Sequence, residues 1–533
     1  MMGLGMSPRR SMLQLLAVFF FLSLLLNVNY PARHLFSWRL FMPSIDVWLL
    51  LGILAAVAWG GKRFLIRSSW AIGFLYLALR IIRVGETAVP MYLNRPFHLY
   101  LDARHLLSVL DLLKTSSRHD NFLLMSAVAL AVVSGFVVSS FYAWRIASKA
   151  LSDGRIRVAY VAGSSVILGF LLIMGQPADR HPTLVRFGRE LLLMQSRVER
   201  ERAFSARLEE AKKERSAGPI SLKGLQGADV LLFFIESYGR TVYTRPRYRP
   251  AMTAVMHKFA ERLDQNGFKA VSAYLTSPTY GGISRLAHGT LESGLRVGSD
   301  IEDTLLLNSS LPPLAAYFRA SGYRTVSVMP GTRFDFPQGD YFGYDQAYYA
   351  DHFNYRGRTF GWAPMPDQFV LDWVHRREFS RREKPLFVRY VLISSHASFN
   401  FQPPFISDWD LIGDGRIYRD RAPIYFPIHW PNLENAEGAY LHALGYEFKT
   451  LGDYFSRYLA ADTLIVILGD HQPNPQLTEA GEPWSVPVHI ISRNPRLLVP
   501  FSKRGYMPGL IPDQPLPHAG METFLPAFVQ DFR

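Results

Sequence analysis

One short segment of the sequence combines residue types that could do chemistry. Residues 277–289 read Ser-Pro-Thr-Tyr-Gly-Gly-Ile-Ser-Arg-Leu-Ala-His-Gly, between a strand-like run at 268–275 and a helix-like run. The two glycines permit a tight turn and a close approach of a ligand to the backbone. Ser284 is then expected at a helix N-terminus, where unpaired amides and the helix dipole favour a bound anion. Its hydroxyl would be either a nucleophile or an N-cap.

Three strand-like runs, the first two of them continuously apolar, end in residues that can bind a metal ion or an anion. Such runs are typical of strands that are buried on both faces of a sheet. They are 230–235, followed by Glu236; 463–468, followed by Gly469, Asp470 and His471; and 387–394, followed by Ser395 and His396. Open parallel sheets bind ligands at the carboxyl ends of their strands, so we expect these side chains to gather at one edge. Taken singly, Glu236 and Asp470 could equally cap the helices that follow them.

The apolar residues are not spread evenly along the 533-residue chain. Hydrophobic residues make up 49% of it and charged residues 19%, and the apolar ones crowd the first third in blocks long enough to span a bilayer. The sequence has no cysteine, which excludes disulfides and cysteine metal sites. The net charge of +14 could indicate a nucleic-acid partner, but arginines beside the apolar blocks account for much of it. We therefore expect a membrane-embedded protein with no nucleic-acid partner.

Five apolar blocks predict a transmembrane domain of five helices over residues 1–176. The blocks are 12–28, 42–60, 69–82, 122–144 and 158–175. The third is the weakest, because Arg80 lies inside it. Basic residues cluster at alternate ends of the blocks, and by the positive-inside rule these ends face the cytoplasm. An odd number of spans from a cytoplasmic N-terminus puts the rest of the chain outside.

Two further regions follow the apolar blocks. Residues 177–217 are dense in both signs of charge, which predicts a helical linker at the membrane surface. From Gly218 onward, buried strand patterns alternate with helical stretches, as is typical of an α/β sheet domain. We expect residues 218–533 to form one large extracytoplasmic α/β domain.

These motifs resemble, in their order along the chain, those of the alkaline phosphatase superfamily. The resemblance is to its branch of lipoteichoic acid synthases and related phosphoglycerol or phosphoethanolamine transferases, which have a sulfatase-like α/β fold. The segments that carry it are Ile235-Glu236-Ser237-Tyr238-Gly239, the Gly-Gly-Ile-Ser ending at Ser284, Phe342-Gly343-Tyr344-Asp345, Ser395-His396 and Gly469-Asp470-His471. Five spans before an external catalytic domain also match, so the resemblance covers nearly the whole chain.

The resemblance implies a site for one divalent cation. Its implied ligands are Glu236, Ser284, Asp470 and His471. Oxygen ligands with one imidazole suit Mn²⁺, which the resemblance favours, and also Zn²⁺ or Mg²⁺. A cation beside the Ser284 hydroxyl favours its alkoxide and polarises a phosphoryl oxygen.

The resemblance also implies catalytic roles for three residues. Ser284 would be the nucleophile, at a position where the family commonly has threonine. His396 would protonate a leaving group or hold the phosphate, unless it is a structural histidine. Arg333 would contact the phosphate as a bidentate donor, or else form a salt bridge with Asp335 or Asp340.

Three more residues near the motifs have no assigned step in the reaction. His288, one turn beyond Ser284, is expected either to face the site or to pack beneath it. Trp362 and Asp367 could shape the pocket, although tryptophan is usually a core residue.

Together these inferences predict a multi-pass enzyme of the bacterial inner membrane with a periplasmic active site. It would move a phosphoglycerol- or phosphoethanolamine-type group from a lipid donor to an envelope glycan or lipid through a phospho-serine. A phosphodiesterase or sulfatase-like hydrolase on the same fold stays open, because transfer and hydrolysis differ only in the acceptor. Formylglycine chemistry is disfavoured, since Ser284 is followed by Arg-Leu-Ala-His rather than by x-Pro-x-Arg. The other alternative is a non-catalytic membrane scaffold.

Overall fold

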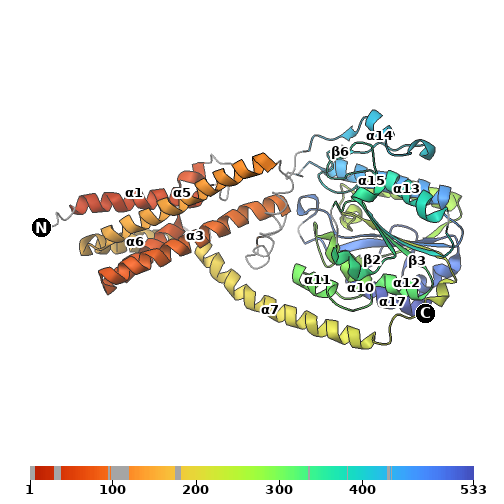
Figure 1. The fold of residues 1–533 in the computed structure, drawn as a ribbon, viewed down its shortest axis with the longest axis horizontal. Coiled ribbons are helices and arrows are strands. Elements are labelled where there is room, and N and C mark those ends of the chain that lie inside the picture. The colour runs from red at the N-terminus through yellow and green to blue at the C-terminus, as the bar shows by residue number, and fades with distance from the viewer. Residues whose placement is uncertain are drawn as a thin grey trace. The chain divides into compact units, whose positions relative to one another are not determined.

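The computed structural model describes residues 7–28, 38–93, 97, 119–173, 182–333, 337–380, 382–428, 433, 435–479 and 481–533. The chain divides into two compact units, Met1–Glu199 and Arg200–Arg533. The first unit is helical, and the second is built around an eight-stranded sheet with helices on both faces (Figure 1).

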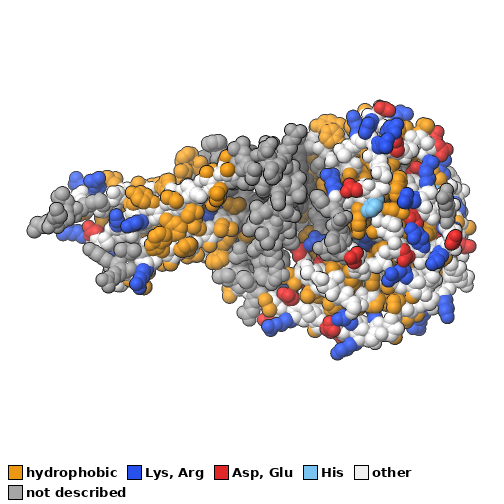
Figure 2. Space-filling model, viewed as in Figure 1, with side chains coloured by type: hydrophobic (Ala, Val, Ile, Leu, Met, Phe, Trp, Pro, Cys, Tyr) orange, Lys and Arg blue, Asp and Glu red, His pale blue; other side chains and the backbone are white. Residues whose placement is uncertain are grey.

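The first unit consists of apolar helices. They are α1 (Pro8–Asn27), α2 (Ile45–Val57), α3 (Lys62–Leu93), α5 (His119–Leu151), α6 (Gly154–Ile173) and the beginning of α7 (Thr183–Glu214). Among the residues that the structure describes, three stretches are long and apolar enough to cross a membrane: Pro8–Asn27, Arg67–Thr87 and Leu130–Leu151. Figure 2 shows hydrophobic side chains along these helices, with most of the visible Lys and Arg near the end that carries the N-terminus.

The prediction of five transmembrane helices is therefore wrong in number. Block 42–60 breaks into α2, which has 13 residues, and a short 3₁₀ turn, Ala58–Gly60. At about 1.5 Å per residue α2 is about 20 Å long, short of the roughly 30 Å of a bilayer core. Block 158–175 runs past the described part of α6. Block 69–82, by contrast, lies in the 32-residue α3, where Arg80 Nη1 donates to the Val28 carbonyl at 2.7 Å.

A buried ion pair ties α3 to α2 and to the start of α7. Arg83 Nη2 lies 2.7 Å from Asp46 Oδ2. The same carboxylate accepts the backbone N–H groups of Thr183 at 3.0 Å and Leu184 at 2.8 Å, and Arg83 donates to Asn27 Oδ1 at 2.7 Å. A carboxylate at the positive end of a helix is favourable, and the added hydrogen bonds offset the cost of burying both charges. This cluster fixes where α7 leaves the first unit.

The second unit is organised around a mixed sheet with the strand order β10-β2-β9-β8-β1-β5-β3-β4. Its strands are β1 (Asp229–Ile235), β2 (Lys269–Thr276), β3 (Arg324–Met329), β4 (Gln346–Tyr349), β5 (Leu386–Leu392), β8 (Thr463–Gly469), β9 (Ser485–Ser492) and β10 (Met507–Pro508). Strands β8, β1 and β5 are parallel neighbours, whereas β9 runs antiparallel to β8 and β2. The predicted α/β sheet is confirmed, and the three strand-like runs that end in polar motifs are its three central strands.

Alternate residues of the central strands pack into two separate cores. In β1, residues 231, 233 and 235 face one core and residues 230, 232 and 234 face the other. The first core is closed by α9 (Arg249–Gln265), α13 (Asp367–Val374) and α15 (Glu437–Tyr458); the second is closed by α10 (Ser284–Ser293), α12 (Leu314–Ala320) and α17 (Phe524–Phe532). Because both faces are covered, β1 and β8 are buried along their whole length, which explains their uninterrupted apolar sequence.

Shorter elements complete the second unit. They are α8 (Thr241–Thr244), α11 (Asp300–Leu307), α14 (Ile417–Asp420), α16 (Val499–Lys503) and the two-stranded sheet of β6 (Phe401–Gln402) and β7 (Ile424–Tyr425).

Candidate metal centre and active site

Glu236 and Asp470 come to lie side by side because of the strand register. In the parallel pair β1 and β8, Ile235 is opposite Gly469, so the next residue of each strand is an acid at the same carboxyl edge. A Cβ at Gly469 would lie 1.8 Å from the Tyr238 carbonyl oxygen. Glycine therefore allows the loop after β1 to close over the end of β8.

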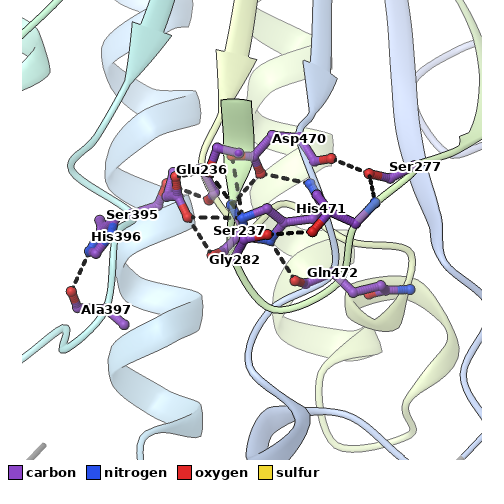
Figure 3. Close-up of polar contacts among 12 residues, drawn as sticks. Glu236, Ser237, Ser277, Gly282, Ser395, His396, Ala397, Asp470, His471 and Gln472 are labelled. Atoms are coloured by element: carbon purple, nitrogen blue, oxygen red, sulfur yellow. Dashed lines mark hydrogen bonds and ion pairs between the residues drawn. The ribbon is translucent and has the colours of Figure 1, made fainter. Parts of the chain in front are cut away.

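Glu236, Asp470 and His471 form a buried group that could hold a metal ion (Figure 3). One ligand atom of each lies within 4.8 Å of the others. His471 Nε2 is 3.3 Å from Glu236 Oε1 and 3.6 Å from Asp470 Oδ2, and Ser284 Oγ is 3.0 Å from Glu236 Oε2 and 3.2 Å from His471 Nε2. Four donors at about 2.1 Å around a tetrahedral cation are about 3.4 Å apart. The donor set therefore fits a four-coordinate divalent cation.

The imidazole of His471 is oriented for ligation. Its Nδ1 lies 2.7 Å from the Gln472 carbonyl oxygen, which can only accept, so Nδ1 carries the proton. The lone pair on Nε2 is then directed toward Glu236 and Ser284, as a metal ligand requires. The same Gln472 carbonyl accepts the N–H of Gly281 at 3.0 Å, which joins the glycine turn before Ser284 to the end of β8.

The charges of this group depend strongly on one another. Burial alone would raise the pKa of Glu236, but the His471 imidazole outweighs burial and holds that pKa well below its usual range. Burial and the adjacent Glu236 charge raise the pKa of Asp470 to about 7. Burial would lower the pKa of His471, but Asp470 and Glu236 outweigh it and raise the pKa to about 9. The two carboxylates thus require a positive partner, which is either a proton on His471 or a bound cation.

Ser284 is the first residue of α10, and its side chain does not cap that helix. The N-cap is Ile283 and makes no side-chain capping bond, while the Ser284 hydroxyl is directed at Glu236 and His471. The capping interpretation is therefore wrong. Ile283 has φ 61° and ψ 46°, a left-handed conformation that costs a β-branched residue about 1–2 kcal/mol. Strain of this kind often accompanies functional residues.

Three serines with no role predicted from the sequence support the metal ligands (Figure 3). Ser237 donates its hydroxyl to Glu236 Oε1 at 3.0 Å and its N–H to Asp470 Oδ1 at 2.8 Å. Ser277 Oγ donates to the Asp470 carbonyl at 2.6 Å, and Ser395 Oγ donates to the Glu236 carbonyl at 2.8 Å. Such outer hydrogen bonds orient ligands. Ser237 and Ser395, which directly follow or adjoin the polar ends of strand-like runs, had a local signal that could have indicated this role.

His396 lies at the carboxyl end of β5, close to Glu236 (Figure 3). Its ring stacks on Trp362 with centroids 3.9 Å apart, and Trp362 is 44% exposed rather than part of the core. The His396 Nδ1 bonds to the Ala397 carbonyl, so Nδ1 is the protonated nitrogen and Nε2 carries the lone pair. The ring is thus held in one orientation beside the metal group.

Arg333 is exposed, and the structure connects it to the site through Trp362. Its Nη2 donates to the Trp362 carbonyl at 2.9 Å. Within the described part of the chain it makes no salt bridge, either to Asp340 or to the metal group, while Asp335 lies outside the described residues. A role in holding the phosphate therefore stays a proposal.

Asp367 and Glu447 form a buried carboxyl pair behind the loop 393–396. Asp367 Oδ2 accepts the N–H groups of Ile393 at 2.8 Å and Ser394 at 2.5 Å. Both side chains are 0% exposed, and the two carboxyl groups lie within hydrogen-bonding reach of each other. Burial and the adjacent Asp367 carboxylate raise the pKa of Glu447 well above its usual range. One proton shared between the two carboxyls allows both to stay buried while Asp367 anchors the loop.

Two other buried histidines are structural. His288 packs its ring against Phe234, with centroids 4.3 Å apart, and burial lowers its pKa to about 3. His489 lies between Ser272 Oγ at 2.7 Å and the Tyr238 hydroxyl at 3.0 Å, and burial lowers its pKa to about 3. Both stay neutral at physiological pH, and neither belongs to the metal group.

No protein-family model and no curated protein matches the chain, but solved structures do. The lipoteichoic acid synthase LtaP from Listeria monocytogenes has a TM-score of 0.36 and 15% identity, over 60% of this chain and 81% of that one. A protein of the alkaline phosphatase superfamily from Vibrio parahaemolyticus has a TM-score of 0.33 and 18% identity, over 50% of this chain and 60% of that one. The phosphoglycerol transferase GacH of Streptococcus pyogenes has a TM-score of 0.35 and 10% identity, over 62% of this chain and 91% of that one. These matches include the superfamily that the motifs resemble; at such TM-scores the chemistry is inferred from the site itself.

We expect the purified protein to hold close to one equivalent of a divalent cation and to lose it to a chelator. Asp470→Asn should weaken cation binding by about ten-fold or more, because it replaces an anionic ligand with a neutral one. Metal analysis after gel filtration measures this. Asp264→Asn, at a carboxylate that is 62% exposed, is the matched control and should keep full content. Full content in Asp470→Asn would remove Asp470 from the ligand set.

The carboxyl pair predicts a pH dependence of stability. Because the pKa of Glu447 is raised in the folded protein, the native state binds this proton more tightly than the unfolded chain does. The resulting stabilisation is complete below the ordinary pKa of about 4.3 and is lost as the pH rises toward the folded value. Glu447→Gln mimics the protonated form, so its melting temperature relative to the unaltered protein should increase as the pH is raised from 5 to 9.

Thermal melts of both proteins across this pH range measure the difference. Glu209→Gln, at a side chain that is 62% exposed, is the control and should show a difference that does not change with pH. A pH-independent difference for Glu447→Gln would contradict the shared proton.

Proposed function

We propose that this protein is a membrane-anchored, metal-dependent phosphotransferase that works through a phospho-serine at Ser284. The observation that supports it best is the position of the Ser284 hydroxyl, 3.0 Å from Glu236 Oε2 and 3.2 Å from His471 Nε2. A hydroxyl placed among potential ligands of a cation is activated as a nucleophile. Its place at the N-terminus of the ten-residue α10 adds unpaired amides that suit phosphoryl oxygens.

In the first step Ser284, as the alkoxide left after its hydroxyl has given its proton to water, attacks the phosphorus of a phosphodiester through Oγ. The bond from Oγ to phosphorus forms, and the bond from phosphorus to the leaving alcohol breaks. A cation held by Glu236, Asp470 and His471 would stabilise the serine alkoxide and polarise the phosphoryl oxygen. The leaving alkoxide needs a proton, and we propose that protonated His396 donates it from Nε2, because Nδ1 is already bonded to the Ala397 carbonyl.

In the second step an acceptor hydroxyl attacks the phosphorus of phospho-Ser284. The acceptor loses its proton, which neutral His396 can take at Nε2, and the bond from phosphorus to Ser284 Oγ breaks. With an envelope glycan or lipid as acceptor the reaction is a transfer, and with water it is a hydrolysis. We propose a lipid donor with a phosphoglycerol or phosphoethanolamine head group, because the apolar helices of the first unit would keep the enzyme at a lipid surface.

The proposed cation is Mn²⁺, on the basis of the motif resemblance. The donor set of oxygens and one imidazole also accepts Zn²⁺ and Mg²⁺. Metal analysis of the purified protein, followed by reloading of the chelated protein with each ion, separates the three.

Ser284→Ala should abolish turnover while the fold persists and the cation still binds, about ten-fold more weakly, because one ligand of four is lost. Ser284→Thr should keep part of the activity, since threonine supplies the same hydroxyl with one added methyl group. Incubation with a lipid donor and no acceptor should leave the mass of the transferred phosphoglycerol or phosphoethanolamine group on the peptide that contains Ser284.

Ser216→Ala, at an exposed serine, is the control and should behave like the unaltered protein. Near-normal activity of Ser284→Ala would move the nucleophile elsewhere. The nearby hydroxyls of Thr279 and Thr276 already donate to the carbonyls of Gly282 at 2.6 Å and His518 at 3.1 Å.

We also infer that the second unit lies outside the cytoplasm. Basic residues at the start of α1 support a cytoplasmic N-terminus under the positive-inside rule, and an odd number of crossings, three or five, then puts the second unit outside. A reporter fusion after Gly218 should therefore behave as external. Fusions after Arg67 and Arg155 tell the two numbers apart, because both should behave as external with three crossings and as cytoplasmic if α2 and α6 also cross. A cytoplasmic Gly218 fusion would contradict both the location and the lipid donor.

A further inference from the structure

The last turns of α7 share a hydrophobic cluster of the second unit with the helix that begins at Ser284. Phe204, Leu208 and Ala211 are spaced four and three residues apart, so they lie on one face of α7. They are 0%, 5% and 5% exposed, and they share a hydrophobic cluster with Leu286 of α10. The end of the linker helix is therefore part of the core beside the candidate nucleophile.

Ile283 packs against this same cluster. It is the third of three consecutive residues with positive φ, after Gly281 at 69° and Gly282 at 150°. Glycine adopts such conformations readily, whereas isoleucine does not. The backbone at Ile283 is thus held against its own preference, and the contact that the structure offers to hold it is the packing of its side chain on the α7 cluster.

A second contact joins the linker to the other end of α10. Arg215, the residue after α7, donates from Nη1 to the Ser293 carbonyl at 2.6 Å, and Ser293 is the last residue of α10. The linker therefore shares a hydrophobic cluster with Leu286, near the beginning of α10, and hydrogen-bonds to the end of that helix. Movement of α10 relative to the metal ligands on β1 and β8 would disturb both contacts.

We propose that Phe204 and Leu208 are positioning residues for Ser284. Their packing holds Ile283 in the left-handed conformation, and that conformation places the Ser284 hydroxyl between Glu236 and His471. The inference rests on the proposed function for the role of Ser284 as nucleophile and cation ligand. It extends that function by making the linker helix a part of the active-site framework as well as a connection between the units.

Cation affinity reports the position of the Ser284 hydroxyl without any turnover. Zn²⁺ titrations of the full chain in detergent compare the unaltered protein with Ser284→Ala, which sets the effect of losing the hydroxyl. Phe204→Ala should weaken Zn²⁺ binding by the same factor, about ten-fold. The double variant Phe204→Ala/Ser284→Ala should be no weaker than either single one, because both changes remove the same interaction.

Rescue separates positioning from a merely structural role. Ile283→Gly should restore Zn²⁺ affinity in the Phe204→Ala background, because glycine needs no packing to adopt a positive φ. Phe204→Leu should keep near-normal affinity, and Leu208→Ala repeats the test if Phe204→Ala does not fold. Phe259→Ala, the same truncation in the core under α9, is the control and should leave affinity unchanged.

Additive losses in the double variant, or no rescue by Ile283→Gly, would overturn the positioning role. Hydrolysis of bis(4-nitrophenyl) phosphate, measured in parallel, tells this failure apart from failure of the proposed function. If the unaltered protein binds Zn²⁺ but cleaves no phosphodiester, the proposed function fails and the positioning role is still judged on the affinities. If the unaltered protein binds no cation, both are overturned.

Discussion

Two carboxylates buried beside one imidazole are the constraint on which the rest of the site depends. Repulsion between charges a few ångströms apart is strong away from water, and it is this repulsion, together with burial, that raises the pKa of Asp470 to about 7. The group is stable only with a positive charge among its donors and with every remaining oxygen hydrogen-bonded. Ser237 supplies hydrogen bonds to both carboxylates, Ser277 and Ser395 hold the backbone carbonyls of Asp470 and Glu236, and the spacing of the donors suits a cation as the positive charge.

The sheet and the linker together place this group. The parallel register of β1 and β8 sets Glu236 and Asp470 next to each other, and Gly469 lets the two strand ends approach. Ser284 belongs to a different segment, which is tied to the β8 end through the Gln472 carbonyl and packed on α7 through the cluster beside Ile283. The buried carboxyl pair of Asp367 and Glu447 anchors the loop that carries His396, because Asp367 accepts the N–H groups of Ile393 and Ser394. The segment that carries each reactive side chain is thus fixed by contacts with residues distant in the sequence.

The number of membrane spans shows where composition alone misleads. Block 42–60 is apolar enough to be counted as a span, but its helix ends after 13 residues in a 3₁₀ turn, and hydropathy does not register such a break. Block 69–82 was the weakest because of Arg80, yet it lies in a long helix where the guanidinium bonds to the Val28 carbonyl. Arg80 is accommodated in this helix by a polar group that follows another helix. The average hydropathy of a single segment cannot reveal such a partner.

What the sequence by itself determined is the part of the protein that depends on local patterns. Continuous apolar runs mark β1 and β8, and a run interrupted by Arg389 marks their neighbour β5. The polar residues that follow these strands, Glu236, His396, Asp470 and His471, gather at one sheet edge because parallel strands end there. Only the tertiary structure decided how Ser284 is used, because its choice between cap and site depends on the backbone of Ile283 and on side chains from β1 and β8. The supporting contacts could not be predicted from the sequence either. Ser277 and Ser395 hydrogen-bond to residues 193 and 159 positions away. A hydrogen bond between such distant residues forms only on folding and produces no periodic pattern in the sequence.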